Sequence, residues 1–192
     1  EHKQAAGHLA AILTIVIWGT TFISTKVLLK SFSPIEILFI RFLIGYATLW
    51  LVYPHQLKPA EKKQELCFAA AGLCGVTLYY LMENMALTYT LASNVGVIIS
   101  IAPFFTAIFS FFLRKGDKPG KRFFLGFVMA MAGICLISGS SGAALSLNPL
   151  GDILAIGAAI IWAVYSLLTR KIGDFGYHVV QATRRTFFYG LI

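Results

Sequence analysis

The chain has 192 residues, of which 58% are hydrophobic and 12% are charged, and its formal net charge is +8. A soluble domain carries about a quarter of its residues as charged side chains, so this composition excludes a soluble globular protein and predicts an integral membrane protein in contact with the lipid bilayer. The basic residues lie in short segments between apolar runs and accompany no nucleic-acid-binding motif, which excludes DNA or RNA as a partner.

Apolar runs long enough to cross a bilayer recur along the chain. A hydrocarbon core of about 30 Å takes about 20 helical residues, and six runs reach about this length. The six predicted spans are Leu9–Leu29, Ile35–Tyr53, Leu66–Thr88, Ser93–Leu113, Phe123–Ser140 and Leu150–Thr169. A seventh begins near Val179 and stops at Ile192. The predicted fold class is therefore all-α, a polytopic bundle of membrane helices joined by short turns.

Lysine and arginine are distributed unequally between the two sides of this bundle. If the N-terminus is inside, thirteen of them are cytoplasmic, Lys26 and Lys30 are outside, and Arg41 lies within a span. The thirteen are Lys3, Lys58, Lys62, Lys63, Arg114, Lys115, Lys118, Lys121, Arg122, Arg170, Lys171, Arg184 and Arg185. Because short cytoplasmic loops carry the excess of positive charge, we expect a cytoplasmic N-terminus, with a bacterial plasma membrane as the location.

An internal repeat appears when the chain is shifted by 144 residues without gaps. The matching pairs are Gly7 and Gly151, Ala11 and Ala155, Ile12 and Ile156, Ile17 and Ile161, Trp18 and Trp162, Thr25 and Thr169, Lys26 and Arg170, and Arg41 and Arg185. Apolar helices share Ala and Ile by chance, but matched tryptophans and basic residues are rarer. Five spans separate the copies, so the second copy enters the membrane from the opposite side. Such inverted repeats are a common basis for alternating access in secondary transporters, with the binding site near mid-membrane.

Several short motifs occur in the order and spacing of one transporter family. They are Trp18-Gly19-Thr20-Thr21-Phe22, Ala86-Leu87-Thr88-Tyr89-Thr90-Leu91-Ala92-Ser93, Ile101-Ala102-Pro103-Phe104-Phe105-Thr106-Ala107, Gly120 and Gly126, Gly151-Asp152, and Ala158-Ala159-Ile160-Ile161-Trp162-Ala163. Over essentially its whole length the chain therefore resembles the EamA-type members of the drug/metabolite transporter superfamily.

This resemblance implies ten helices in two five-helix repeats, both termini in the cytoplasm, and a central cavity for amino acids, other metabolites or drugs. Residues 1–145 would form the first repeat, and residues 146–192 would start the second. On this plan the chain is truncated in its seventh helix, and we expect a complete protein of roughly 290 residues.

Polar residues of the third span are candidates for substrate binding or coupling. Glu83 and Asn84 lie there, with Tyr79 and Tyr80 one turn earlier on the same face. A carboxylate within the membrane is costly, which favours a proton site or a counter-charge to an amine, with protons as the coupling ion. The alternative is that Glu83, about five residues from the outer end of the span, reaches the lipid headgroups.

Two arginines at matching repeat positions are candidates for a gate or a structural anchor. Arg41 lies in the second span, where it could pair with Glu83 or hold a substrate carboxylate. Arg185 would mirror Arg41 near the inner end of the seventh helix. A mirrored pair favours a gate or an anchor over contact with substrate.

Two tryptophans lie too deep for the aromatic belt at the membrane surface. Trp18 and Trp162 each sit about ten residues into their spans, so they either line the cavity or pack between the repeats. Thr21, Ser100 and Tyr165 are further candidates for the cavity wall, although Ser and Thr often only form hydrogen bonds across helices.

Two features of the later spans concern helix geometry. Pro103 lies mid-span and predicts a kink, which often marks a transport site. Gly126, Ala130 and Gly133 form a stripe of small residues on the fifth span, for which close helix packing is favoured over dimerisation.

No catalytic set of residues is present. The sequence has no cluster of His, Asp and Glu with metal-ligand spacing, so we expect no enzyme activity, metal or cofactor. The predicted function is secondary active transport, as an exporter or exchanger of small metabolites such as amino acids or their derivatives. The alternatives are a passive facilitator or channel of the same fold and a structural membrane subunit that transports nothing. The sequence leaves the oligomeric state open.

Overall fold

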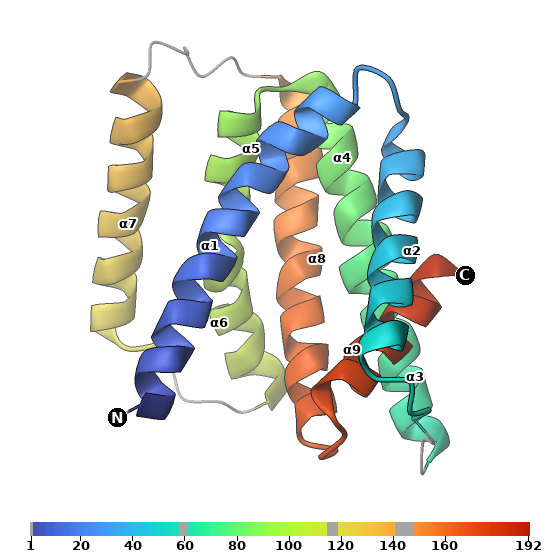
Figure 1. Cartoon of the computed structure of the whole chain (residues 1–192). Coiled ribbons are helices and arrows are strands. Elements are labelled where there is room, and N and C mark those ends of the chain that lie inside the picture. Colours follow the sequence, from blue (N-terminus) through green and yellow to red (C-terminus); the bar gives the residue numbers. More distant parts are fainter. Residues whose placement is uncertain (1, 58–60, 115–118, 141–147) are drawn as a thin grey trace.

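The structure is a computed structural model that describes residues 2–57, 61–114, 119–140 and 148–192. These residues form α-helices joined by turns, with one stretch of π-helix and no β-strand among them (Figure 1). The elements are α1 (His2–Leu28), α2 (Pro34–Val52), α3 (Lys62–Gly72), η1 (Leu73–Leu78), α4 (Tyr79–Tyr89), α5 (Ala92–Ile99), α6 (Ala102–Arg114), α7 (Lys121–Ser140), α8 (Pro149–Gly173) and α9 (Val179–Leu191).

The helices agree with the predicted spans. Within the described residues, five helical stretches are long and apolar enough to cross a membrane. These are Gly7–Leu28, Pro34–Val52, Lys62–Tyr89, Ala92–Phe112 and Pro149–Gly173. The predicted span Phe123–Ser140 coincides with α7, a helix of 20 residues. The prediction of an all-helical polytopic membrane bundle is therefore confirmed.

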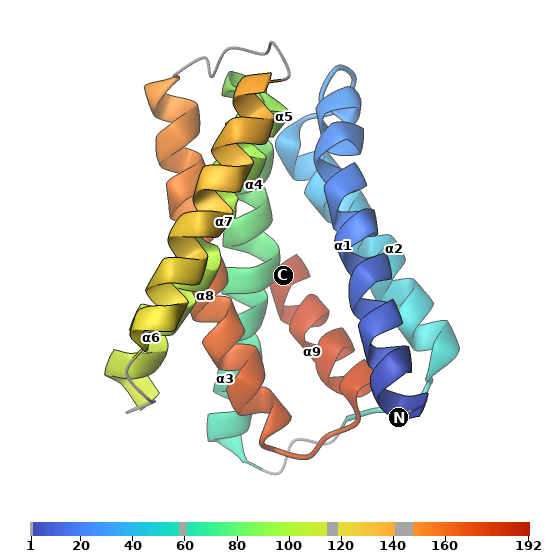
Figure 2. The same cartoon turned by 90° about the vertical axis from the view of Figure 1, so that its left-hand side faces the viewer.

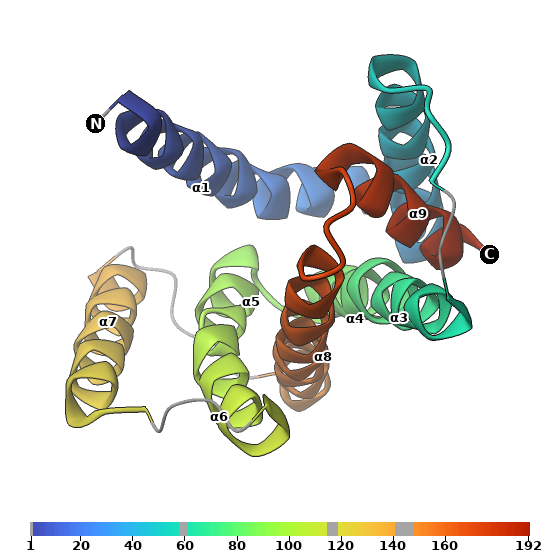
Figure 3. The ribbon, with the colours of Figure 1, turned by 90° about the horizontal axis from the view of Figure 1, so that it is seen from below.

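Two rows of helices make up the bundle. Seen from one end, one row contains α7, α5 with α6, α8, and α4 with α3, while α1 and α2 lie on the other side (Figure 3). In the side view α9 lies between the rows in their lower half (Figure 2). The helices α1 and α8 run in opposite directions, because α1 rises from the end where α8 finishes (Figure 1).

Helix boundaries follow local chemistry. Ser33 is the N-cap of α2 and forms a capping box with Glu36, and Pro34 follows it in the first turn. The fourth span is interrupted at Ser100 and Ile101, between α5 and α6. The interruption comes just before Pro103, which has no N–H with which to continue the helix, so the predicted kink is confirmed.

The π-helix η1 interrupts the third span and was not predicted. In η1 the backbone N–H of Tyr79 reaches the carbonyl of Cys74, five residues earlier, instead of the residue four back. This wider turn lies between α3 and α4 and shifts the faces that the two helices present. A π-helical turn within an α-helix is frequently found at a functional site.

Close approach of backbones holds α3 and η1 against α9. A Cβ built on Gly72 would lie 2.5 Å from the carbonyl oxygen of Thr186 and 2.7 Å from the backbone nitrogen of Gly190. A Cβ on Gly190 would lie 2.3 Å from the Cβ of Val76. The two segments therefore meet at positions where only glycine fits.

The stripe on α7 does not mediate the close packing that its sequence favoured. Among the described residues, no atom outside its own helix backbone and chain neighbours lies within 4 Å of a Cβ built on Gly126 or Gly133. The described residues therefore show no close helix contact at these two glycines. Other predictions fall outside the described residues: the sidedness of Lys58, Lys115 and Lys118, and the boundary between residues 145 and 146.

Candidate substrate site between the helix rows

An aromatic cluster joins α1, α4 and α8 in the middle of the bundle. The rings of Trp18 and Trp162 meet edge to face, with centroids 5.6 Å apart and planes at 86°. The Trp162 ring also lies 4.7 Å from Tyr79 and 5.2 Å from Tyr165. Two residues matched by the 144-residue shift are therefore in contact with each other, and two further predicted site residues surround them.

The cluster continues from α4 to α2 and α9. Tyr79 and Tyr80 have centroids 4.8 Å apart, Tyr80 and Phe42 are 4.8 Å apart, and Phe42 and Phe187 are also 4.8 Å apart. Phe42 and Phe187 were not predicted. The sequence contains 16 phenylalanines, mostly in apolar runs, so nothing in its pattern distinguishes these two from ordinary lipid-facing or packing residues.

Glu83 is a buried carboxylate beside this cluster. Its side chain lies on α4, one turn after Tyr79, and the residue is only 2% exposed. Tyr79 and Arg41 are its electrostatic neighbours. A residue so enclosed does not extend to the lipid headgroups, so the alternative interpretation of Glu83 is not supported. Burying an ionisable group within the membrane costs free energy, so such a group is by default a candidate functional residue.

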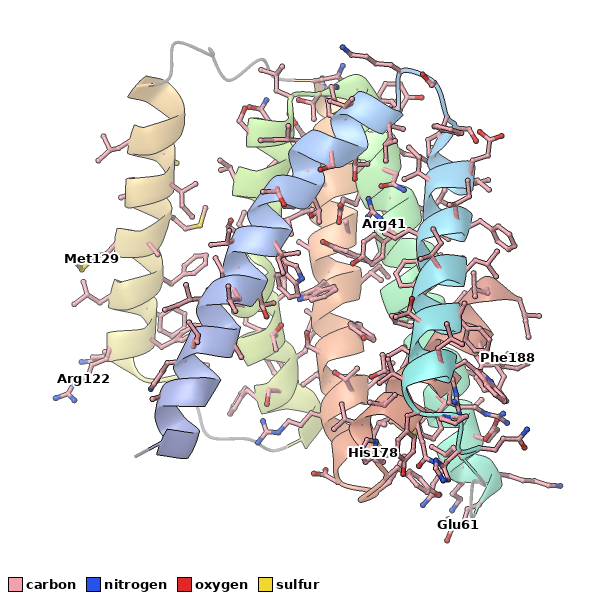
Figure 4. All side chains as sticks on the ribbon, viewed as in Figure 1. Arg41, Glu61, Arg122, Met129, His178 and Phe188 are labelled. Carbon is pink, nitrogen blue, oxygen red and sulfur yellow. The ribbon has the colours of Figure 1, made fainter. Side chains whose placement is uncertain are left out.

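The side chain of Arg41, a residue of α2, extends toward α4 (Figure 4). It does not form the ion pair with Glu83 that was considered for it. Its Nη2 donates a hydrogen bond of 2.6 Å to the hydroxyl of Thr25, which is fully buried. Its guanidinium carbon lies 5.5 Å from the centroid of the Tyr80 ring. Within the part of the chain that the structure describes, no ion pair within 4.0 Å joins it to Glu83. The guanidinium therefore faces the aromatic cluster while a hydroxyl of α1 fixes its position.

Asn84 connects α4 to the beginning of α2. Its Nδ2 donates a 3.0 Å hydrogen bond to the carbonyl of Pro34, and the residue is completely buried. Its Oδ1 is buried and has no hydrogen-bond partner among the described residues. The donor half of this amide therefore serves helix packing, and only the acceptor half remains available.

Three predicted site residues lie apart from the aromatic cluster or are already satisfied. The hydroxyl of Thr21 donates to the carbonyl of Trp18 at 2.7 Å, and that of Ser100 donates to Gly96 at 2.7 Å. Ser100 and Pro103 line a separate apolar hollow of about 380 Å³ against α7. The structure therefore divides the predicted residues into a central group and a peripheral one.

Arg185 takes a different partner from its repeat mate. It forms an ion pair with Glu65 on α3, in which its Nε donates to Oε1 at 2.8 Å and its Nη2 donates to the same oxygen. The hydroxyl of Tyr189 also donates to this oxygen. Arg185 thus connects α9 to α3.

The ring of Tyr165 can reach the cluster because it packs over Gly75 of η1, which has no side chain in the way. A Cβ on Gly75 would lie 2.2 Å from Cδ2 of the Tyr165 ring, so the ring lies directly on the backbone of η1. Sequence reasoning missed this contact, although two glycines three residues apart, Gly72 and Gly75, were a signal in an otherwise apolar span.

The described residues contain no cluster of side chains that would form a metal-binding site. Among them, no group of three or more His, Cys, Asp and Glu side chains is placed to hold a metal ion. The arrangement instead offers aromatic faces, one buried carboxylate and one guanidinium. These groups can bind an organic molecule without forming a covalent bond.

Comparison with known proteins assigns the family. Residues 5–139 match the model of the EamA-like transporter family. An uncharacterized transporter of Archaeoglobus fulgidus is 33% identical over 85% of this chain and 57% of its own length. The uncharacterized transporter YvbV of Bacillus subtilis is 27% identical over 90% and 56%, and the uncharacterized inner membrane transporter YedA of Escherichia coli is 30% identical over 82% and 51%.

This chain spans somewhat more than half the length of these curated relatives. No solved structure matches it significantly. The family model covers most of the chain, and the relatives it resembles are transporters and not enzymes. The chain therefore belongs to the EamA-like transporter family, and its long apolar helices make it an integral membrane protein in contact with the lipid bilayer.

Proposed function

We propose that this protein is a secondary active transporter of small amphipathic metabolites, with amino acids or their derivatives as the first class to test. In the proposal two inverted repeats alternate access to a central site, the first formed by residues 1–145 and the second beginning at residue 146. The N-terminus lies in the cytoplasm of a bacterial plasma membrane. The observation that carries the proposal is the contact between Trp18 and Trp162 beside the buried Glu83.

The contact between the tryptophans supports an inverted repeat. When two copies of a unit are related by a two-fold axis, a residue close to the axis touches its own counterpart. Trp18 and Trp162 are counterparts at the 144-residue offset, and their rings meet at 5.6 Å. The helices that carry them, α1 and α8, run antiparallel (Figure 1), as an axis in the membrane plane requires.

The chemistry of the cluster supports a substrate with an apolar body and a charged end. The faces of Trp162, Tyr79 and Tyr80 suit a flat or apolar group, and aromatic faces also attract an ammonium. Glu83 supplies a negative charge for an amine, and Arg41 can pair with a carboxylate. A zwitterion such as an amino acid would use both charges.

Proton coupling follows if Glu83 alternates between binding a proton and binding the substrate amine. A carboxylate enclosed by aromatic rings is stable when it is neutral or paired with a cation, so the two ligands compete for it. Export of an amine would then draw a proton inward. Arg41 remains bound to Thr25 and does not neutralise Glu83 by direct contact.

The test is transport by the purified full-length protein in liposomes. Counterflow of labelled amino acids, nucleosides and cationic drugs identifies the class, and a pH jump tests uphill accumulation. We expect Glu83→Gln to abolish pH-driven accumulation while exchange of the same substrate continues. Glu61→Gln is the matched control, because Glu61 is exposed and its side chain makes no capping hydrogen bond.

Each result has a defined meaning. Accumulation that survives Glu83→Gln would contradict the coupling role. Saturable exchange without uphill accumulation would indicate a facilitator, and no flux of any class by folded protein would contradict transport of these metabolites.

A further inference from the structure

Arg184 on α9 is a buried cation without an acidic partner in the part of the chain that the structure describes. The residue is 5% exposed. Its Nη1 donates to the carbonyl of Tyr53 at 2.7 Å, its Nη2 donates to the carbonyl of His55, and its guanidinium carbon lies 5.3 Å from the centroid of the Trp50 ring. Two carbonyls accept hydrogen bonds from the guanidinium and the Trp50 ring contacts it, but none of these groups carries a negative charge that would balance it. A buried charge without a counter-charge is strongly destabilising.

The neighbouring Arg185 has the acidic partner that Arg184 lacks among the described residues. Arg185 is more exposed than Arg184, yet it has the carboxylate of Glu65 as a partner. The more deeply buried of two adjacent arginines is thus the one whose charge is not balanced. Because a guanidinium has five N–H donors and two of them are accounted for, Arg184 retains donors for a further acceptor.

A small polar cavity adjoins Arg184. It has a volume of about 180 Å³, and we call it the α2–α9 cavity. The residues of its wall that matter here are Tyr46, Trp50, Gln56, Gln181, Arg184 and Arg185. Among the residues that the structure describes, no Asp or Glu belongs to this wall, and its two charged side chains are both positive. This volume is sufficient for a tetrahedral anion together with a few waters.

The α2–α9 cavity lies at the boundary between apolar surface and basic loops. Trp50 on α2 and Phe188 on α9 belong to its wall and are partly exposed, and Figure 4 shows Phe188 on the outer side of α9. Leu51 and Val52, which follow Trp50 at the end of α2, are highly exposed and apolar. Lys62 and Lys63 begin α3 at the same end of the bundle. This is the depth at which lipid headgroups meet a membrane protein, on the side that carries the excess of positive charge.

From these observations we propose that the α2–α9 cavity binds a phosphate group, with Arg184 as its principal ligand. Arginine pairs with phosphate oxygens through two parallel N–H donors, and Arg185 and the amides of Gln56 and Gln181 line the same cavity. The phosphate belongs either to the headgroup of an anionic lipid or to a soluble phosphate. The site is separate from the aromatic cluster and does not depend on what the protein transports.

The test measures binding by its effect on thermal stability, because a ligand that binds only the folded state stabilises it. Purified full-length protein in detergent is titrated with short-chain phosphatidylglycerol, short-chain phosphatidylcholine, or inorganic phosphate against chloride at equal ionic strength. The midpoint of unfolding is followed by size-exclusion chromatography. Phosphatidylglycerol alone would identify a lipid site, whereas stabilisation by inorganic phosphate would identify a site for the free anion.

The variant is Gln56→Glu, and the matched control is Lys171→Gln. Substitution of Arg184 itself would also release the carbonyls of Tyr53 and His55, so it would mix loss of binding with loss of folding. Gln56→Glu places a carboxylate in the cavity wall and leaves those bonds in place. Lys171→Gln changes the net charge by the same amount on an exposed residue at the end of α8, outside the cavity.

We expect wild type and Lys171→Gln to be stabilised at the same concentration of anion. Gln56→Glu should need at least about tenfold more, because a carboxylate in the cavity wall repels the phosphate and competes with it for Arg184. The proposal is overturned if neither phosphatidylglycerol nor phosphate stabilises the protein more than its control. It is also overturned if Gln56→Glu responds to the anion as Lys171→Gln does.

Discussion

The glycines in two regions of this molecule differ in how closely neighbouring helices approach them. Where α3 and η1 pack against α8 and α9, the glycines at positions 72, 75 and 190 each lie where an added methyl group would strike a neighbour. On α7, Gly126 and Gly133 face open space among the described residues. The sequence shows a small-residue pattern in both places. A small-residue pattern therefore marks a possible contact, and whether the contact forms depends on the neighbouring helix.

This contrast also separates the predicted site residues. Tyr165 lies on Gly75 of η1, so the central aromatic cluster is seated on the tightly packed region. Ser100 and Pro103 line the hollow beside α7, where the helices are loosely packed. A transport site with one rigid wall and one loosely packed neighbour is suited to movement of one helix group against the other.

Gly72→Ala should have the largest effect on folding stability of the glycine substitutions. The new methyl group would meet backbone atoms of Thr186 and Gly190 at 2.5 and 2.7 Å, and backbone cannot swing aside as a side chain can. We expect a loss of about 3 kcal/mol or more in folding free energy, seen as a much lower unfolding temperature in detergent or as failure to accumulate in the membrane. An unfolding temperature equal to that of wild type would show that α3 and α9 do not meet in this way.

The same substitution at Gly75 should have a smaller effect. Here the obstacle is the ring of Tyr165, which can rotate away at the cost of its contact with Trp162. We expect a loss of about 1–2 kcal/mol, together with weaker substrate exchange, because the aromatic cluster is disturbed. Unfolding temperature and counterflow are measured on the same preparation. Unchanged exchange in a destabilised Gly75→Ala protein would separate Tyr165 from the site.

The sequence predicted the spans well because crossing a bilayer requires length and apolarity, which are local properties. It also predicted the interruption before Pro103, since a missing N–H acts locally. The pairing of Trp18 with Trp162 was anticipated only as equal depth and one of two possible roles. Their contact depends on how α1 and α8 pack, which no local pattern specifies.

Partners of charged residues were the part that the sequence could not predict. The sequence placed Lys26 on the outer side and matched it with Arg170 in the repeat. Its Nζ in fact donates to the carbonyls of Leu87 and Thr90 at the end of α4. Such a cation at a helix C-terminus satisfies exposed carbonyls. Arg184 does the same for the end of α2. Both depend on chain segments that lie far apart in the sequence, and apolar helices show no polar face that would indicate their neighbours.

A third prediction concerns the two mirrored arginines. Arg185 has the carboxylate of Glu65 as a partner, whereas Arg41 contacts the hydroxyl of Thr25 and the ring of Tyr80. We expect Glu65→Gln to lower folding stability by about 1 kcal/mol, because the pair is partly exposed and glutamine can still accept one hydrogen bond. A double-mutant cycle of Glu65→Gln with Arg185→Gln measures the coupling. Additive losses in unfolding free energy would show that the ion pair does not join α3 to α9.

Gly126→Ala on α7 should have the smallest effect and the opposite sign. Nothing outside its own helix would meet the added methyl group among the described residues, and alanine favours a helix over glycine by about 0.5–1 kcal/mol. We therefore expect a slightly higher unfolding temperature than that of wild type, measured beside Gly72→Ala and Gly75→Ala, which gain the same helix propensity. Because the three substitutions are chemically identical, their differences report only the space around each glycine. If Gly126→Ala proved as harmful as Gly72→Ala, α7 would have a close neighbour in the folded protein, and the original expectation for its small-residue stripe would be restored.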